Sequence, residues 1–151
     1  MEFNLVPVTG SAAEKIAEWR YEPPYDFYNL DADPEDYAAF MDPSNWETKF
    51  AVEDGDGTLV GFFDLTPRNQ FVEVGLGMHP DLTGQGLGRT FVEAGLRHAR
   101  DDLEADVFEL AVATFNDRAI SVYEDIGFEY VETYSQRTNG GEYEFLRMRR
   151  E

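Results

Sequence analysis

A glycine-rich segment between a predicted strand and a predicted helix is the part of the sequence best suited to binding an anion. Residues 82–89 read Leu-Thr-Gly-Gln-Gly-Leu-Gly-Arg. Glycines let backbone N–H groups converge into a nest of anion size, and the following helix adds unpaired N–H groups and the positive end of its dipole. Residues 83–89 therefore predict a phosphate-binding loop, called the cradle below. The alternative is a tightly packed turn without a ligand.

This segment matches neither of two common nucleotide-binding motifs. A dinucleotide-binding fingerprint that begins at Gly84 needs a third glycine where Arg89 stands. A P-loop needs Gly-Lys-Ser/Thr after four spacer residues, and the segment contains no lysine. The sequence therefore disfavours a nucleotide-dependent phosphotransferase.

Hydrophobic spacing orders the elements around the cradle. Strands are expected at residues 3–8, 50–53, 59–65, 71–78, 107–114, 129–137 and 143–149. Helices are expected from a capping box at Ser11–Glu14, from Asp33-Pro34, along the stripe Val92, Leu96, Ala99 and Leu103, and from Asn116 or Asp117 to Gly127. The order βααβββαβαββ indicates an α/β (α+β) layer structure with a mixed, mainly antiparallel sheet, in a single domain over residues 1–151.

The cradle and a second motif together resemble the GNAT family of N-acetyltransferases. Motif A of that family runs Gln/Arg-x-x-Gly-x-Gly/Ala; here Gly86 and Gly88 take the two small positions, and Thr83 replaces the usual Gln or Arg. Residues 115–128, Phe-Asn-Asp-Arg-Ala-Ile-Ser-Val-Tyr-Glu-Asp-Ile-Gly-Phe, are similar to the family's Asn-x-x-Ala-x-x-x-Tyr-x-x-x-Gly-Phe helix. The expected element order is similar to the GNAT fold across the whole chain.

The resemblance implies that acetyl-CoA is the co-substrate, held where the fourth and fifth strands separate, with no metal. It assigns the pantetheine arm and thioester to backbone groups of Leu76 and Met78, and placement of the cofactor to Asn116, which is also an ordinary helix N-cap. The pyrophosphate would be bound by the cradle, that is by Thr83, Gly84, Gln85, Gly86, Leu87, Gly88 and Arg89. Gly75 and Gly77 suit a bulge or a close backbone approach, although a plain glycine-containing strand is the alternative.

The resemblance also implies direct attack of an amine on the thioester. Tyr123 resembles the tyrosine that protonates the departing thiolate, and a phenol of pKa near 10 is protonated at neutral pH. Tyr123 also falls on the apolar stripe of its helix, so a packing role is the alternative. Glu73 is the candidate general base on the strand, with water relays or an already neutral amine as alternatives.

Five aromatic residues lie between the first two predicted helices, the region that often shapes the acceptor pocket in this family. Their rings could enclose an apolar or cationic amine, or could simply cover the core. They are Trp19, Tyr21, Tyr25, Phe27 and Tyr28.

The charge balance limits the partners. The chain of 151 residues has 31 Asp and Glu against 12 Lys and Arg, a net charge of −19, so a nucleic-acid or anionic-membrane surface is not expected. The segment from Val74 to Arg100 is an exception, because its three arginines outnumber its two acids. The acidity therefore leaves room for one polyanionic cofactor and favours a cationic amine as acceptor.

Other residue types bear on location and assembly. There is no cysteine, hence no disulfide or thiolate site, and neither a basic leader nor a long apolar stretch, so we expect a cytoplasmic protein. His79 and His98 stand far apart without a carboxylate pattern, which disfavours a zinc site. The C-terminal hairpin could pair with a second copy in a homodimer.

The sequence thus predicts an acetyl-CoA-dependent N-acetyltransferase that acts on a primary amine of a small molecule. The alternative is a non-catalytic acyl-CoA-binding sensor or interaction domain that kept the cradle and lost the chemistry.

Overall fold

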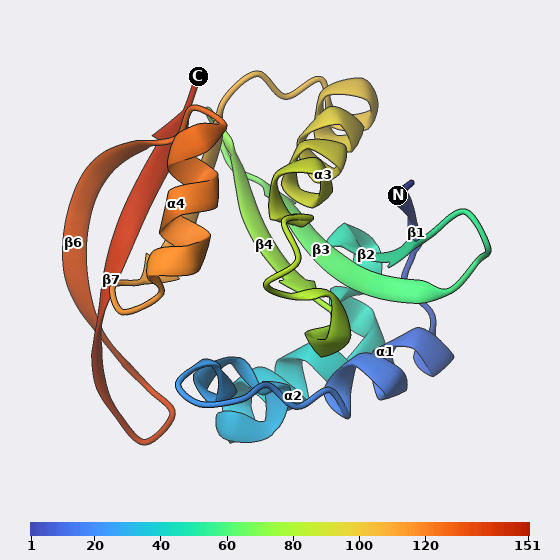
Figure 1. The fold of residues 1–151 in the computed structure, drawn as a ribbon, viewed down its shortest axis with the longest axis horizontal. Helices are drawn as coiled ribbons and strands as arrows, with labels where there is room; N and C mark the ends of the chain where they lie inside the picture. Colours follow the sequence, from blue (N-terminus) through green and yellow to red (C-terminus); the bar gives the residue numbers. More distant parts are fainter.

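All residues, 1–151, are described by the computed structural model, in which seven strands form one sheet (Figure 1). The strands are β1 (Asn4–Pro7), β2 (Lys49–Glu53), β3 (Leu59–Pro67), β4 (Val72–Met78), β5 (Phe108–Ala113), β6 (Glu129–Thr138) and β7 (Gly141–Arg150). The α-helices are α1 (Gly10–Ala17), α2 (Pro34–Met41), α3 (Gly88–Leu103) and α4 (Asp117–Asp125). Short 3-10 turns are η1 (Tyr25–Tyr28), η2 (Leu30–Ala32), η3 (Pro43–Thr48) and η4 (Pro80–Leu82).

The sheet has the order β1-β2-β3-β4-β5-β7-β6. Every neighbouring pair is antiparallel except β4 and β5, which are parallel because the chain crosses between them through α3. The predicted element order and the mixed, mainly antiparallel sheet are therefore confirmed.

Consecutive residues of β3 show how the helices cover the two faces of the sheet. Side chains alternate along a strand, and Phe62 packs edge-on against Phe40 of α2 whereas Phe63 stacks on Phe91 of α3, with ring centroids 5.4 and 4.8 Å apart. Helices α2 and α3 therefore lie on opposite faces. Figure 1 shows α4 and α3 on either side of the gap that opens beside β4.

The start of α1 differs from the sequence prediction. The helix begins at Gly10, and its N-cap is Thr9, whose Oγ1 accepts a hydrogen bond of 3.2 Å from the Ala12 amide. The capping box that begins at Ser11 is therefore wrong. Thr9 has the extended backbone of a cap immediately after β1, with φ −118° and ψ 166°, so the helix is already under way at Ser11.

Strand β4 contains no bulge. Its register with β3 is unbroken from Met78 opposite Gly61 to Val72 opposite Pro67, so the bulge expected from Gly75 and Gly77 is absent. A Cβ at Gly77 would instead collide with the ring of Phe62 on the neighbouring strand. Glycine is needed there for a close approach, and the approaching group is an aromatic side chain of the protein itself.

No helix combines the length and the apolar composition that a membrane span requires. No group of three or more His, Asp or Glu side chains converges so that it could hold a metal ion.

Candidate functional site

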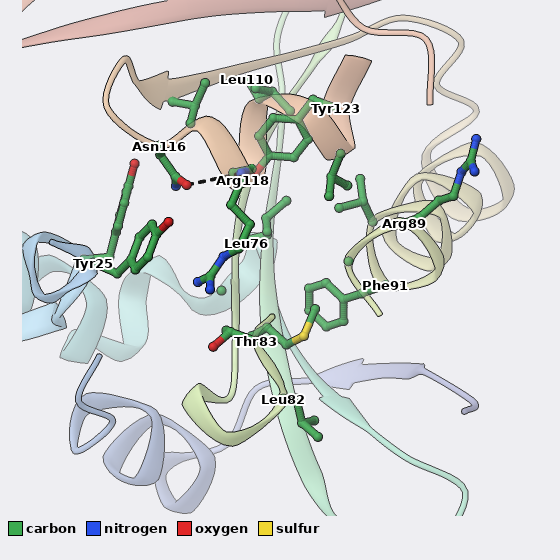
Figure 2. A pocket seen from close by; sticks show the side chains of 18 of the residues that line it. Tyr25, Leu76, Leu82, Thr83, Arg89, Phe91, Leu110, Asn116, Arg118 and Tyr123 are labelled. Carbon is green, nitrogen blue, oxygen red and sulfur yellow. Dashed lines mark hydrogen bonds between the residues drawn. The ribbon is translucent and has the colours of Figure 1, made fainter. Parts of the chain in front are cut away.

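The site begins where β4 and β5 separate. These strands pair only at Val72 with Phe108 and at Glu73 with Glu109, and beyond those pairs they diverge. From Val74 onward β4 pairs with β3 alone, so its backbone groups on the β5 side have no strand partner. A cavity of about 690 Å³ fills the gap (Figure 2).

The cavity is lined by both strands, the cradle, the start of α3, helix α4 and three tyrosines from the segment after α1. Its walls are mostly apolar, and its only charged lining residues are Arg89, Arg118 and Asp125. The lining residues are Tyr21, Tyr25, Tyr28, Phe62, Val74, Gly75, Leu76, Gly77, Met78, Leu82, Thr83, Gly84, Gly86, Gly88, Arg89, Phe91, Val92, Leu110, Ala111, Val112, Asn116, Arg118, Ala119, Val122, Tyr123 and Asp125.

The cradle has the backbone geometry of an anion nest. Gly84 and Gly86 have φ of +74° and +76°, which residues with side chains rarely adopt. A Cβ at Gly86 would meet no atom within 4 Å, so this glycine faces open space. Helix α3 then begins at Gly88 without a side-chain cap and without an acid in its first turn, which leaves its first N–H groups free.

The polar side chains of Thr83 and Gln85 form hydrogen bonds with backbone carbonyls just before the cradle. The Thr83 hydroxyl donates to the Pro80 carbonyl at 2.8 Å, and the Gln85 amide donates to the Asp81 carbonyl. Gln85 and Leu87 do not line the cavity. Anion binding at the cradle would therefore depend on backbone N–H groups.

Two arginines reach the cavity from opposite sides. Arg89, predicted from the cradle, donates to the carbonyl of Asp125 near the end of α4 at 3.1 Å. Arg118 was missed by sequence reasoning. Its guanidinium lies 4.1 Å from the centroid of the Tyr25 ring, and its Nη1 would be 3.4 Å from a Cβ at Gly84. A signal did exist, because Arg118 is the only basic residue between Arg100 and Arg137.

Tyr123 on α4 both packs and faces the cavity. Its side chain is 8% exposed and contacts Phe128 edge-on, as its place on the apolar stripe predicts. The same residue lines the cavity, so the packing role and the exposure to a ligand coexist. Burial, with a smaller contribution from neighbouring Tyr28, raises its pKa far above the ordinary value, and the phenol is protonated at neutral pH.

Asn116 likewise is both an N-cap and a residue of the cavity lining. Its Oδ1 accepts from the Ala119 amide at 3.2 Å, which makes it the N-cap of α4, and it also lines the cavity. Burial raises the pKa of Tyr28, and the nearby Asn116 side chain and the Ala113 amide lower it in part.

Tyr21 and Tyr28 bind the two facing strand ends. The Tyr21 hydroxyl donates to the carbonyl of Met78, the last residue of β4, at 2.8 Å. The Tyr28 hydroxyl accepts from the amide of Ala113, the last residue of β5, at 3.2 Å. The wide end of the gap is thus closed by two phenols from one segment.

Besides Gln85 and Leu87, three predicted site residues lie outside the cavity lining. Trp19 packs against His79 with centroids 5.0 Å apart, and Phe27 belongs to an aromatic cluster with Tyr143 and Phe145 of β7. Glu73 is bound by Arg68 at 3.1 Å and does not reach the cavity. Leu76 and Met78, in contrast, both line it.

Residues 13–128 match the Acetyltransferase (GNAT) family. The matched region includes β4, the cradle, β5 and α4, which together form most of the cavity wall. The chain belongs to the GNAT acetyltransferase family, whose acyl donor is acetyl-CoA.

Curated relatives extend the comparison. The chain is similar to the mycothiol acetyltransferase of Propionibacterium freudenreichii subsp. shermanii, with 38% identity over 89 residues, which are 54% of this chain and 28% of the relative. It is also similar to the spermidine N(1)-acetyltransferase of Vibrio cholerae serotype O1, with 31% identity over 87 residues, 56% of this chain and 50% of the relative. The chain thus spans half or less of the length of these relatives.

Solved structures agree on the fold. A spermidine N-acetyltransferase from Vibrio cholerae in complex with CoA and spermine superposes with a TM-score of 0.71 at 23% identity, covering 97% of this chain and 94% of that one. A chimera built on the same Vibrio cholerae enzyme gives a TM-score of 0.73 at 24% identity, covering 99% and 96%. The GNAT fold therefore extends over nearly the whole chain.

Proposed function

We propose that residues 1–151 form one N-acetyltransferase domain, which transfers the acetyl group of acetyl-CoA to a primary amine of a small molecule. The observation that carries this proposal is the gap between β4 and β5, which forms one cavity with the cradle. Family membership supports the donor, and the geometry of the gap supports its use by this chain.

The residues present fit acetyl-CoA. A pantetheine arm carries amides, and the unpaired backbone groups of β4 beyond Glu73 offer it hydrogen bonds of the kind a neighbouring strand would make. A pyrophosphate needs converging N–H donors, which the cradle and the start of α3 supply. The open space at Gly86 leaves room for it.

The chemistry requires one proton donor. The amine nitrogen bonds to the thioester carbonyl carbon, the carbon–sulfur bond breaks, and the sulfur leaves as a thiolate that must be protonated. We assign this proton to the Tyr123 hydroxyl, because it lines the cavity and is kept protonated by burial. The incoming ammonium must lose one proton before it attacks, and the nitrogen loses a second as the amide forms; this second proton balances the one that the Tyr123 phenolate must regain through solvent. Because Glu73 is bound by Arg68 outside the cavity, we favour water as that acceptor.

The acceptor end is formed by aromatic rings. Tyr21, Tyr28 and Phe62 line it, and rings of this kind bind the apolar part of an amine. The net charge of −19 attracts a cationic amine from solution, although no carboxylate other than Asp125 lines the cavity. We therefore propose a small primary amine with a compact apolar body.

The test is release of CoA thiol from acetyl-CoA on a panel of amines, run beside calorimetry of acetyl-CoA binding. The panel includes arylalkylamines, polyamines, amino acids and a peptide with a free N-terminus. Turnover on a small amine supports the proposal. Tight acetyl-CoA binding with no turnover on any amine would instead indicate an acyl-CoA-binding sensor, and the absence of binding would reject both.

A further inference from the structure

We propose that Arg118 supplies the charged phosphate contact that Thr83 cannot make, and that Tyr25 holds Arg118 in place for it. This inference rests on the proposed function, because it names a further phosphate ligand at the same cofactor site. The sequence analysis assigned Tyr25 to the acceptor pocket, whereas this proposal assigns it to the cofactor side of the cavity.

The cradle lacks a charged side chain of its own that points at the nest. The Thr83 hydroxyl is short and is bound to the Pro80 carbonyl. Arg89 is long enough to reach, but its guanidinium is bound to the carbonyl of Asp125, across the gap on α4. A doubly charged pyrophosphate bound there would meet only backbone dipoles from the loop itself.

Arg118 reaches the nest from the opposite wall. It starts from the first turn of α4, and its Nη1 is the atom closest to a Cβ built on Gly84, at 3.4 Å. Figure 2 shows the Arg118 side chain projecting into the cavity toward Tyr25 and Thr83. The guanidinium therefore bridges the α4 wall and the cradle.

The charge of Arg118 is not neutralised by an acid of the protein. Four of the other arginines are paired with acids, as in Arg20 with Asp31 at 2.7 Å and Arg68 with Glu73 at 3.1 Å. Arg118 forms no salt bridge and no hydrogen bond in a chain with 31 acidic residues. The free guanidinium and the backbone N–H groups of the nest are all hydrogen-bond donors. A bound anion would accept hydrogen bonds from both.

Tyr25 fixes the direction of this side chain. The guanidinium stacks on its ring at 4.1 Å, an arrangement that suits arginine better than lysine. The ring is itself fixed, because η1 is tied to β5 through the Tyr28 hydroxyl and to the β6–β7 turn through Asn139, whose Nδ2 donates to the Phe27 carbonyl at 2.8 Å. Tyr25 is thus a positioning residue that acts through Arg118.

The test is calorimetry of acetyl-CoA with the wild type, Arg118→Met, Tyr25→Leu and the double variant. Loss of one charge-assisted contact predicts roughly 10- to 100-fold weaker binding in Arg118→Met. Loss of the stacking partner predicts a roughly 2- to 10-fold weaker Kd in Tyr25→Leu. In the Arg118→Met background, Tyr25→Leu should have no further effect. Equal effects of Tyr25→Leu in both backgrounds would overturn the positioning role.

Three controls separate the possible causes. S-acetylpantetheine, which carries no phosphate, should act equally well as a donor with the wild type and with Arg118→Met if Arg118 binds phosphate. Arg97→Met, an exposed arginine of α3 outside the cavity, should bind acetyl-CoA as the wild type does. Arg118→Lys should retain part of the affinity but lose its dependence on Tyr25. Thermal unfolding of each variant checks that it folds.

The outcomes distinguish this inference from the proposed function. Wild-type protein that binds no acetyl-CoA would remove the proposed function. Wild-type protein that binds it, with Arg118→Met binding equally tightly or with Arg89→Met losing more affinity than Arg118→Met, would leave the function standing and overturn the role of Arg118.

Discussion

The two ends of the cavity are built in different ways. The cofactor end consists of β4, the cradle, β5 and the starts of α3 and α4, and it offers mainly backbone groups. The proposed acceptor end is lined by Phe62 of β3 and by Tyr21 and Tyr28, which come from a segment whose only regular structure is the short turn η1. The first end is held by the sheet, and the second is held by contacts with distant parts of the chain.

Those distant contacts come from the C-terminal hairpin. Asn139, at the β6–β7 turn, donates to the Phe27 carbonyl, and its own amide donates to Asp33 Oδ2 at 3.0 Å. Phe27 packs against Tyr143 with centroids 4.7 Å apart. The hairpin lies outside the region that matches the family, residues 13–128. The comparison teaches that the proposed cofactor end is built from elements inside the matched region, whereas the proposed acceptor end also depends on a hairpin outside it.

The largest expected effect is at the cofactor end. Gly86→Glu should abolish acetyl-CoA binding, because it forces a side chain into a φ of +76° and places a negative charge in the nest. Gly57→Glu is the matched control, since Gly57 has a φ of +81°, equally open space and a place outside the cavity. Calorimetry showing wild-type affinity in Gly86→Glu would refute the phosphate site.

Tyr123→Phe should lower kcat about 100-fold and leave the Kd of acetyl-CoA nearly unchanged. The reason is that phenylalanine preserves the packing against Phe128 but removes the proton donor. Steady-state kinetics with a saturating amine, beside calorimetry, checks both parts. An unchanged kcat would remove Tyr123 from the mechanism.

A smaller effect is expected at the acceptor end from Asn139→Gly. Glycine keeps the φ of +51° and the backbone bond to Asp33, and loses the side-chain bonds to the Phe27 carbonyl and the Thr138 hydroxyl. The lost bonding stabilises the segment of residues 21–28 by about 1 kcal/mol. Its loss should therefore raise KM for the amine roughly fivefold without changing the Kd of acetyl-CoA. Asn45→Ala, which loses a comparable 2.9 Å bond to the Ala39 carbonyl, should leave KM for the amine unchanged. Equal changes for both substrates would mean that the two ends are not independent.

A last effect, independent of ligands, is on stability at alkaline pH. Burial raises the pKa of Tyr21 to about 12, while the unfolded chain ionises near its ordinary value of about 10. The folded state therefore holds the proton that the unfolded state releases, so the free energy of unfolding is unaffected below pH 10 and falls from about pH 10 to 12. Urea unfolding of Tyr21→Phe at a series of pH values should show a shallower fall than the wild type. An identical pH dependence would contradict the burial of this phenol.

The sequence predicted most of the residues that line the proposed cofactor end, because each motif lies within one short stretch of the chain. The cradle glycines and the α4 motif lie within single elements, and the strands around them follow from alternation. Arg118 could not be placed, since its contact with Gly84 spans the gap between two separate elements. The absence of a bulge at Gly75 and Gly77 could not be foreseen either, because it depends on the ring of Phe62 from β3.

The acceptor end was predicted as a segment but not residue by residue. Residues 25–28 form a 3-10 turn, in which positions three apart share a face. Tyr25 and Tyr28 therefore both face the cavity, whereas Phe27 faces the hairpin. The aromatic segment has no helical or strand period in the sequence, and its two prolines indicate only a semi-rigid loop.

The early end of β4–β5 pairing has a consequence for association with other chains. Open strand edges are templates on which a foreign strand can add, and this sheet has two of them facing each other inside the molecule. The Tyr21 hydroxyl occupies the last carbonyl of one edge and the Tyr28 hydroxyl the last amide of the other. A foreign strand that entered the gap from this end would have to displace both hydroxyls before it could pair with either edge.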